Sequence, residues 1–400
     1  MDRFFGIFKI DFASNRIYGL DILRAFAIMF VCIGHGSNLL PERLGSVTNL
    51  FVLDGVSIFF VLSGFLIGGI LIKVVEKDGL NLQTLRQFWV RRWFRTLPNY
   101  FLILITLCIL HWLFDDRFAW DRVSRFFIFS QNLFTEHPLW FFPEAWSLSI
   151  EEWFYLSFPV LTLLILTLCT TFRKSILYAA ITVIVASIAY RYYIFTTETV
   201  NTLEVWDSQL RKQVITRLDS LMFGVVGGYL YYYHKTLWSK YKKQLLVCGT
   251  FMLLFSRYVL ENFIEINSVY TCVFSFTLVS AATLFLLPFL NELRTGKGLL
   301  HRSITYISLI SYSMYLVNYS IVQTWILRAI PWENFQINGY LILISKYSIY
   351  WILVISLSIL IYKYFEVPMT ALREKFGEKS LSAPKPGQGQ SASVPPRARI

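Results

Sequence analysis

Charged residues are scarce in this chain of 400 residues. They make up 16% of the sequence, whereas hydrophobic residues make up 56% and aromatic residues 18%. Soluble domains carry charge on roughly 25% of their residues and do not collect apolar residues into runs of membrane length. Here the apolar residues do come in such runs. The composition therefore excludes an ordinary soluble domain and predicts a protein that crosses a membrane several times.

Cysteine is also rare, and its spacing excludes two kinds of site. No two of the five cysteines have the Cys-X-X-Cys spacing of a zinc site, and all five fall within predicted membrane spans: Cys32, Cys108, Cys169, Cys248 and Cys272. We expect them to be small apolar packing residues. The sequence predicts neither a metal site nor a disulfide framework, and it contains no internal repeat.

Ten apolar segments are long enough to be transmembrane helices, so we predict an all-α bundle of about ten spans. Their approximate ranges are 18–40, 50–72, 98–114, 148–170, 175–195, 214–234, 244–260, 268–290, 304–330 and 340–362. We assign residues 1–376 to one integral membrane domain. Residues 377–400 are rich in Gly, Ser, Pro and Gln, which predicts a disordered cytoplasmic tail.

The formal net charge of +12 has an uneven distribution along the predicted spans. Loops on the side of the N-terminus carry most of the lysines and arginines, and such loops usually stay in the cytoplasm. We therefore predict that both termini are cytoplasmic. The basic side would face anionic headgroups of the lipid bilayer, so the charge does not indicate a nucleic acid partner.

The first span carries three ionisable residues, Asp21, Arg24 and His35. Such groups are costly at membrane depth and usually line a polar cavity, so they mark a functional site. Arg24 and His35 lie eleven residues apart, which places them within about 20° of each other on a helix and roughly 16 Å apart along its axis. We expect a guanidinium and an imidazole to face one cavity at two depths. The alternative for His35 is a hydrogen-bonded packing residue.

Two further stretches are candidate contacts for a phosphorylated cofactor. Arg91, Arg92 and Arg95 cluster on a helix, and guanidinium groups suit phosphate oxygens. The alternative for these arginines is an ordinary basic anchor at the cytoplasmic surface. Ser63 and Gly64 on the second span would allow a ligand to approach closely, and tight packing between helices explains them equally well.

The fourth span begins with paired carboxylates, Glu151 and Glu152. The first span runs outward and the fourth inward, so these residues and His35 are expected at the same depth. We predict that one of the glutamates orients His35 or the hydroxyl of a bound substrate. Ser149 and Glu152 have the spacing of a capping box, so a structural role is the alternative for that glutamate.

Polar residues on the sixth and ninth spans are predicted contacts for the substrate: Arg217, Asp219 and Asn318. Residues at i and i+2 do not share a face of a helix, so Arg217 and Asp219 are expected to meet different partners. Hydrogen bonding between helices is the alternative for the polar residues around Asn318.

Seven stretches, in this order, resemble motifs of the acyltransferase-3 family of integral membrane acyltransferases. They are LDILRAFAIMFVCIGH (20–35), GVSIFFVLSGFLI (55–67), FWVRRWFRTLPNY (88–100), WSLSIEEWFYL (146–156), RLDSLMFG (217–224), ISLISYSMYLVN (307–318) and FEVP (365–368). The resemblance implies transfer of an acyl group, usually acetyl, from cytoplasmic acyl-CoA to a carbohydrate hydroxyl, with His35 essential. It also implies a bacterial-type cytoplasmic membrane. The chain departs from the family at Ser57, where many relatives have Asp, and at Asn318, where the motif often ends in His.

The hypothesis that joins these features is an O-acyltransferase of a cell-surface carbohydrate, such as a polysaccharide or lipopolysaccharide, or of its lipid-linked precursor. The arginine cluster would hold the phosphates of CoA, the pantetheine arm would pass Arg24, and His35 would be the general base. One alternative is a glycolipid transporter or flippase. Another is an acyltransferase acting on a cytoplasmic small molecule. The sequence specifies neither the acceptor hydroxyl, the acyl chain length nor the oligomeric state.

Overall fold

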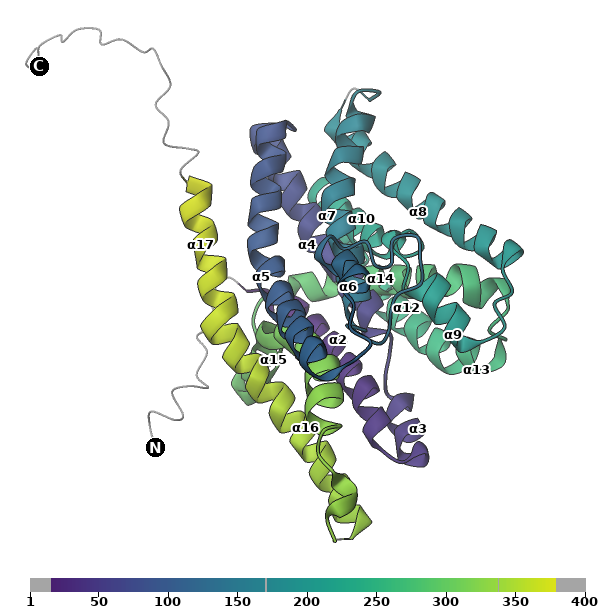
Figure 1. The fold of residues 1–400 in the computed structure, drawn as a ribbon. Coiled ribbons are helices and arrows are strands. Elements are labelled where there is room, and N and C mark those ends of the chain that lie inside the picture. Colours follow the sequence, from purple (N-terminus) through teal and green to yellow (C-terminus); the bar gives the residue numbers. More distant parts are fainter. Residues whose placement is uncertain (1–15, 170, 337, 379–400) are drawn as a thin grey trace, which may run out of the picture.

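The computed structural model describes residues 16–169, 171–336 and 338–378 (Figure 1). Within these ranges every regular element is a helix, so the prediction of an all-α protein is confirmed there. The predicted tail of residues 377–400 lies outside the described residues from position 379 onward.

The helices that position the site have the following bounds: α2 (Tyr18–Gly36), α3 (Glu42–Leu50), α4 (Gly55–Asp78), α5 (Leu82–Phe114), α7 (Ala145–Leu166), α8 (Phe172–Thr197), α10 (Leu218–Tyr233), α12 (Lys242–Phe255), α14 (Ser275–Glu292), α15 (Gly298–Val317), α16 (Gly339–Ile361) and α17 (Val367–Glu378). The π-helical segments η2 (Asp207–Arg211), η5 (Asn318–Leu327) and η7 (Tyr362–Glu366) continue three of the helical runs. As a result α16, η7 and α17 form one long rod at the edge of the bundle (Figure 1).

Eight helical segments of the described residues are long and apolar enough to cross a membrane: Tyr18–Leu39, Glu42–Asp78, Leu82–Phe114, Ala145–Leu166, Phe172–Thr197, Lys242–Phe263, Tyr270–Glu292 and Gly339–Leu372. Helices α10 and α15 occupy the other two predicted ranges, 214–234 and 304–330, and are not among the eight. The count of ten spans and the cytoplasmic side of the termini stay predictions.

Helix α5 is much longer than the predicted span 98–114, because it begins at Leu82. Asn81 caps it, since the side-chain oxygen of Asn81 accepts the backbone N–H of Thr84 at 2.9 Å. The arginine-rich stretch is therefore the first half of a membrane helix and not a separate surface segment. The predicted span was based on apolar runs, and the arginines interrupt the apolar run, so the span was predicted to begin too late.

Glycines let α4 and α10 approach each other closely. A β-carbon on Gly64 would lie 1.9 Å from the carbonyl oxygen of Leu221, and one on Gly224 would lie 2.1 Å from that of Val61. Small residues permit this backbone contact between membrane helices. Gly64 therefore serves helix packing, which was the alternative to its prediction as a cofactor contact.

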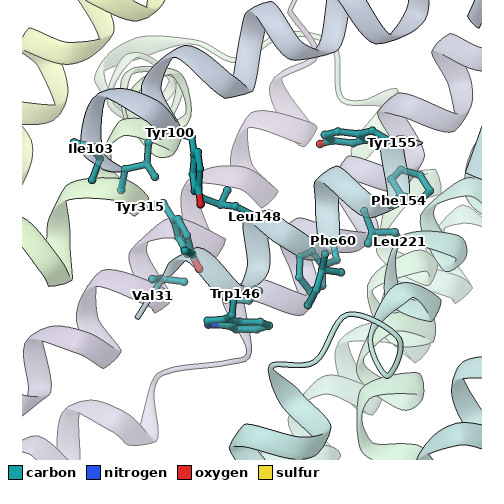
Figure 2. Packing of buried hydrophobic residues seen from close by; sticks show 14 of the residues in the cluster. Val31, Phe60, Tyr100, Ile103, Trp146, Leu148, Phe154, Tyr155, Leu221 and Tyr315 are labelled. Carbon is teal, nitrogen blue, oxygen red and sulfur yellow. The ribbon is translucent and has the colours of Figure 1, made fainter. Parts of the chain in front are cut away.

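The largest apolar cluster fills the space between α2, α4, α5, α7, α15 and α16. Figure 2 shows part of it, with Val31 of α2, Phe60 of α4, Tyr100 of α5 and Trp146 of α7 near Tyr315 of α15. This cluster holds in place the helices that carry the ionisable residues.

We predict that Gly64→Ala destabilises the protein by about 2 kcal/mol or more, because the added methyl group meets a backbone oxygen that cannot rotate away. Unfolding in mixed detergent micelles, followed by tryptophan fluorescence, measures this loss. Gly339→Ala is the matched control, since no atom lies within 4 Å of a β-carbon there. Equal stability of the two variants would contradict the packing role of Gly64.

Candidate active site

His35 lies half-buried in a cavity of about 360 Å³, called here the His35 cavity. The cavity is enclosed by the end of α2, the start of α4, the segment before α7, η2 and the junction of α15 with η5. Its walls include Val31, His35, Asn38, Asp54, Val56, Leu139, Glu144, Trp146, Arg211, Lys212, Tyr315 and Tyr319. Polar and aromatic side chains therefore surround the imidazole.

Asn318 fixes the orientation of His35. The amide nitrogen of Asn318 donates to the carbonyl oxygens of Met314 and Tyr315 at 2.9 and 2.8 Å. Its oxygen therefore faces the Nδ1 atom of His35, 2.6 Å away, and can only accept. Nδ1 then carries the imidazole proton, which leaves the lone pair of Nε2 available as a base. Asn318, predicted to contact the acceptor, contacts the candidate base instead.

A buried chain of polar groups lies behind this cavity. Arg217, which has no exposed surface, donates to the Ser57 hydroxyl at 2.5 Å, and Ser57 donates to the carboxylate of Asp54 at 2.5 Å. Arg217 Nη2 lies 3.9 Å from Asp54. Asp54 thus supplies a negative charge beside Ser57, the position at which the resemblance to the family implied an aspartate. Arg217 itself does not line the cavity, so it is not a direct acceptor contact in this structure.

Asp219 lies away from the described cavities. Its carboxylate is fully buried and pairs with Arg191 at 2.7 Å, which is also fully buried. The prediction that Arg217 and Asp219 meet different partners is confirmed. The prediction that Asp219 contacts the acceptor is not supported by this geometry, because the Arg191 pair already satisfies the carboxylate.

Arg24 faces a second, smaller cavity of about 120 Å³, called here the Arg24 cavity. It lies between α2, α4, α5, α7 and α15, and its walls include Arg24, Val56, Ser63, Arg92, Arg95, Thr96, Ser147, Glu151, Ser308, Tyr312, Tyr315 and Glu366. Neither Arg92 nor Arg95 has a carboxylate within 4 Å among the described residues. The cavity wall therefore carries three guanidinium groups and two carboxylates. The guanidinium groups belong to Arg24, Arg92 and Arg95, and the carboxylates to Glu151 and Glu366.

Arg91 is separate from this group. Its side chain is exposed and lines neither cavity, whereas Arg92 donates to the hydroxyl of Tyr155 at 3.1 Å. Successive residues on a helix are about 100° apart, so Arg91 and Arg92 face different directions. The predicted cluster of three arginines is therefore made by Arg92 and Arg95 together with Arg24.

The glutamates of α7 belong to the Arg24 cavity and its surroundings. Glu151 accepts from Ser63 at 2.8 Å and from Tyr155 at 2.6 Å, and Glu152 accepts from Thr96 at 2.8 Å. Neither lines the His35 cavity, so the expectation of a glutamate from this pair beside His35 is wrong. The reason is that α7 begins at Ala145 rather than near residue 148, which places Glu151 deeper than expected.

Glu144 is the glutamate that does line the His35 cavity. It precedes α7 and accepts from the backbone N–H and the hydroxyl of Ser320, at 3.0 and 2.6 Å. Burial raises the pKa of Glu144 to about 7. The sequence reasoning missed Glu144 and Asp54, because a lone carboxylate just before a membrane helix is also an ordinary helix-start residue.

One wall separates the two cavities, although the sequence predicted a single cavity. Val56 and Tyr315 line both of them, and Figure 2 shows Tyr315 among the buried apolar residues of the cluster. The Tyr315 hydroxyl donates to the carbonyl oxygen of Glu144 at 3.0 Å and lies 2.6 Å from the hydroxyl of Ser147. Arg24 and His35 therefore lie on one face of α2 but line different cavities, one on each side of Tyr315.

Residues 17–363 match the family of the acyltransferase domain, which covers most of the chain. The chain belongs to the acyltransferase-3 family. Together with the apolar helices, this membership identifies an integral membrane protein with several spans. No solved structure matches the chain.

Three relatives of this acyltransferase-3 protein have names that describe O-acetyl transfer. A protein of Staphylococcus aureus (strain COL), provisionally named an O-acetyltransferase, is 28% identical over 326 residues, covering 76% of this chain and 50% of the relative. A provisionally named peptidoglycan O-acetyltransferase of Bacillus subtilis (strain 168) is 34% identical over 191 residues, 40% of this chain and 28% of the relative. The peptidoglycan O-acetyltransferase OatA of Listeria monocytogenes is 33% identical over 168 residues, 39% and 25% of the two chains. The chain spans about half the length, or less, of these relatives.

His137 supports the segment that carries Glu144 to the cavity of this acyltransferase-3 protein. It is only 4% exposed, and its Nε2 donates to the carbonyl oxygen of Phe142 at 3.1 Å. Its Nδ1 is buried without a partner, so a second proton there would have no acceptor. Burial accordingly lowers the pKa of His137 to about 4.

We predict that the contribution of His137 to stability is lost as the pH falls from about 6.5 to about 4, while Glu144, whose pKa is raised to about 7, contributes in the opposite direction. In this range the unfolded chain protonates His137 and the folded chain does not, so acid favours unfolding by up to about 3 kcal/mol. His137→Gln keeps a donor for Phe142 and should become more stable relative to the wild type as the pH falls through this range, measured by detergent unfolding. His234→Gln, at an exposed position, is the control. An unchanged profile in His137→Gln would contradict the assignment.

Proposed function

We propose that this chain is a membrane O-acyltransferase that moves an acyl group, most simply acetyl, from acyl-CoA to a hydroxyl of a cell-surface carbohydrate or its lipid-linked precursor. The observation that carries the proposal is the pair of cavities on one helix, a cationic one at Arg24 and one with an oriented imidazole at His35. Family membership and the names of the relatives support it. The cytoplasmic membrane of a bacterium is the proposed location.

The Arg24 cavity would receive the donor. Arg92 and Arg95 have no carboxylate partner among the described residues, so phosphate oxygens of CoA can complete their coordination. A volume of about 120 Å³ is too small for the whole of CoA. The nucleotide would therefore remain outside, near the α5 arginines, and the thioester would point toward the wall at Tyr315.

The His35 cavity would receive the acceptor hydroxyl. His35 Nε2 takes the hydroxyl proton while the oxygen attacks the thioester carbonyl carbon. The tetrahedral intermediate collapses by breaking the carbon–sulfur bond, and the imidazolium returns its proton to the leaving thiolate. The products are the ester and free CoA. Tyr315 and Ser147 supply hydroxyl groups at the wall where negative charge develops on the oxygen.

The two alternatives fit the geometry less well. A flippase needs a continuous polar path for a headgroup, and here the Tyr315 wall divides the path into two compartments. A cytoplasmic small-molecule acceptor would have to share the smaller Arg24 cavity with the donor. The larger cavity, with the candidate base, is the better place for a sugar.

We predict that His35→Ala abolishes acyl transfer while the protein still folds, because no other group in that cavity is an oriented imidazole. Transfer is measured with the purified protein in vesicles, labelled acetyl-CoA and a peptidoglycan or polysaccharide fragment as acceptor. His234→Ala, at an exposed site, should keep activity. Transfer at the wild-type rate in His35→Ala would remove His35 from the mechanism.

We predict that Arg92→Ala and Arg95→Ala each weaken CoA binding by about tenfold, the loss expected for one charge-assisted contact. Arg91→Ala is the matched control on the same helix, because Arg91 lines neither cavity. Titration with CoA and with dephospho-CoA measures the affinities. If Arg91→Ala weakens binding as much as the other two, the cluster acts as a general basic surface and not as a phosphate site.

A further inference from the structure

A groove of about 700 Å³ opens beside the His35 cavity. It lies between η5, the segment that follows it and α16, and its walls are formed by Asn38, Leu39, Tyr319, Gln323, Thr324, Leu327, Arg328, Ile330, Pro331, Trp332, Glu333, Asn334 and Lys346. We call it the Trp332 groove. Asn38 and Tyr319 line both the groove and the His35 cavity, so the two spaces adjoin. The ring centroid of Tyr319 lies 4.9 Å from that of His35.

The charges of this groove have no ion-pair partners. Arg328, Glu333 and Lys346 have no oppositely charged group within 4 Å among the described residues. The groove wall therefore carries two cations and one carboxylate, which are not paired with one another. Arg328 and Glu333 are exposed, and Lys346 is half-buried.

Lys346 is the most informative of these residues. It is the one charged residue between Gly339 and Tyr362 in the sequence, and it lies within a segment that is able to span a membrane. A lysine in such a helix is costly unless water or an anion meets it. Since no acidic side chain of the described residues pairs with it, the groove has room for an anion from outside the chain.

The rest of the groove has the chemistry of a carbohydrate site. Trp332 is half-buried, and its indole N–H donates to the carbonyl oxygen of Leu327 at 2.8 Å, which fixes the ring. A fixed aromatic face binds the apolar face of a sugar ring. Asn38 and Asn334 add amide groups for hydroxyls.

We propose that the Trp332 groove binds an anionic part of the acceptor, a carboxylate or a phosphate on a carbohydrate, between Arg328 and Lys346. The hydroxyl to be acylated would then reach His35 past Asn38 and Tyr319. This inference rests on the proposed function and narrows its acceptor to a negatively charged carbohydrate longer than one ring. A lipid headgroup has the same anionic chemistry, so the experiment separates the two sources.

The test measures binding without donor, so that it does not depend on turnover. The full chain is placed in vesicles of phosphatidylcholine and titrated with two matched pairs of probes. The first pair is the disaccharide of N-acetylglucosamine and N-acetylmuramic acid, which has a carboxylate, against uncharged diacetylchitobiose. The second is N-acetylglucosamine phosphate against N-acetylglucosamine. The wild type should bind the anionic member of at least one pair roughly fivefold more tightly.

Removing a cation and removing the carboxylate of the groove should change the preference for the anionic probe in opposite directions. Arg328→Gln and Lys346→Gln should remove the preference for the anionic probe, Glu333→Gln should increase it, and none should change binding of the neutral probe. Lys346→Arg keeps the charge and should retain the preference. Lys235→Gln, exposed and outside the groove, is the control. Because Arg328 is exposed, its variant tests the proposal even if the Lys346 variants fail to fold.

Three results would overturn the proposal. The first is equal binding of the charged and neutral members of both pairs. The second is an unchanged preference in Arg328→Gln and Lys346→Gln. The third is loss of probe binding when phosphatidylglycerol replaces part of the phosphatidylcholine, if this loss is smaller in Arg328→Gln and Lys346→Gln. That result would assign the groove to a lipid headgroup. Absence of acetyl transfer with this binding pattern intact would instead count against the proposed function alone.

Discussion

The cost of holding charge inside an apolar bundle constrains this structure more than any other factor. Arg191 forms an ion pair with Asp219. Arg217 donates to the hydroxyl of Ser57, which in turn donates to Asp54. Asp21 lies between Arg16 and Arg24, which form ion pairs with it. These groups have charged or polar partners within the chain and hold helices together. Arg92, Arg95 and Lys346 have no carboxylate within 4 Å among the described residues and line cavities, so a bound anion would gain an ion pair at each of them.

Local helix geometry accounts for what the sequence predicted correctly. Spacing along α2 was enough to place Arg24 and His35 on one face, because the helical repeat fixes both angle and rise. The same rule placed Arg217 and Asp219 on different faces. The prediction for Glu151 failed since it depended on where α7 begins, and a shift of three residues moves a side chain by roughly 4.5 Å along the helix axis.

Contacts between distant segments could not be read from the sequence. Ser57 stands where the resemblance implied an aspartate, and Asp54, three residues earlier, provides a charge for Arg217. Asn318 cannot act as a base, yet its amide is held by two backbone carbonyls so that its oxygen faces His35. Ser57 and Asn318 thus each make a polar contact with a residue of another segment, Ser57 with Arg217 and Asn318 with His35. These contacts depend on how α2, α4, α10 and η5 pack against one another, so no single sequence motif predicts them.

The wall between the cavities bears directly on the proposed reaction. A thioester that enters beside Arg24 is separated from the imidazole by Tyr315 and Val56, and the hydroxyl of Tyr315 is bonded to the carbonyl oxygen of Glu144. In the proposed reaction such a barrier would keep the activated acyl group away from water that reaches His35 and would limit hydrolysis. For transfer to occur, the Tyr315 side chain has to leave the Glu144 carbonyl or the thioester has to replace it there. The start of α7, which carries that carbonyl, then becomes the point where binding of the acceptor can be coupled to opening of the donor path.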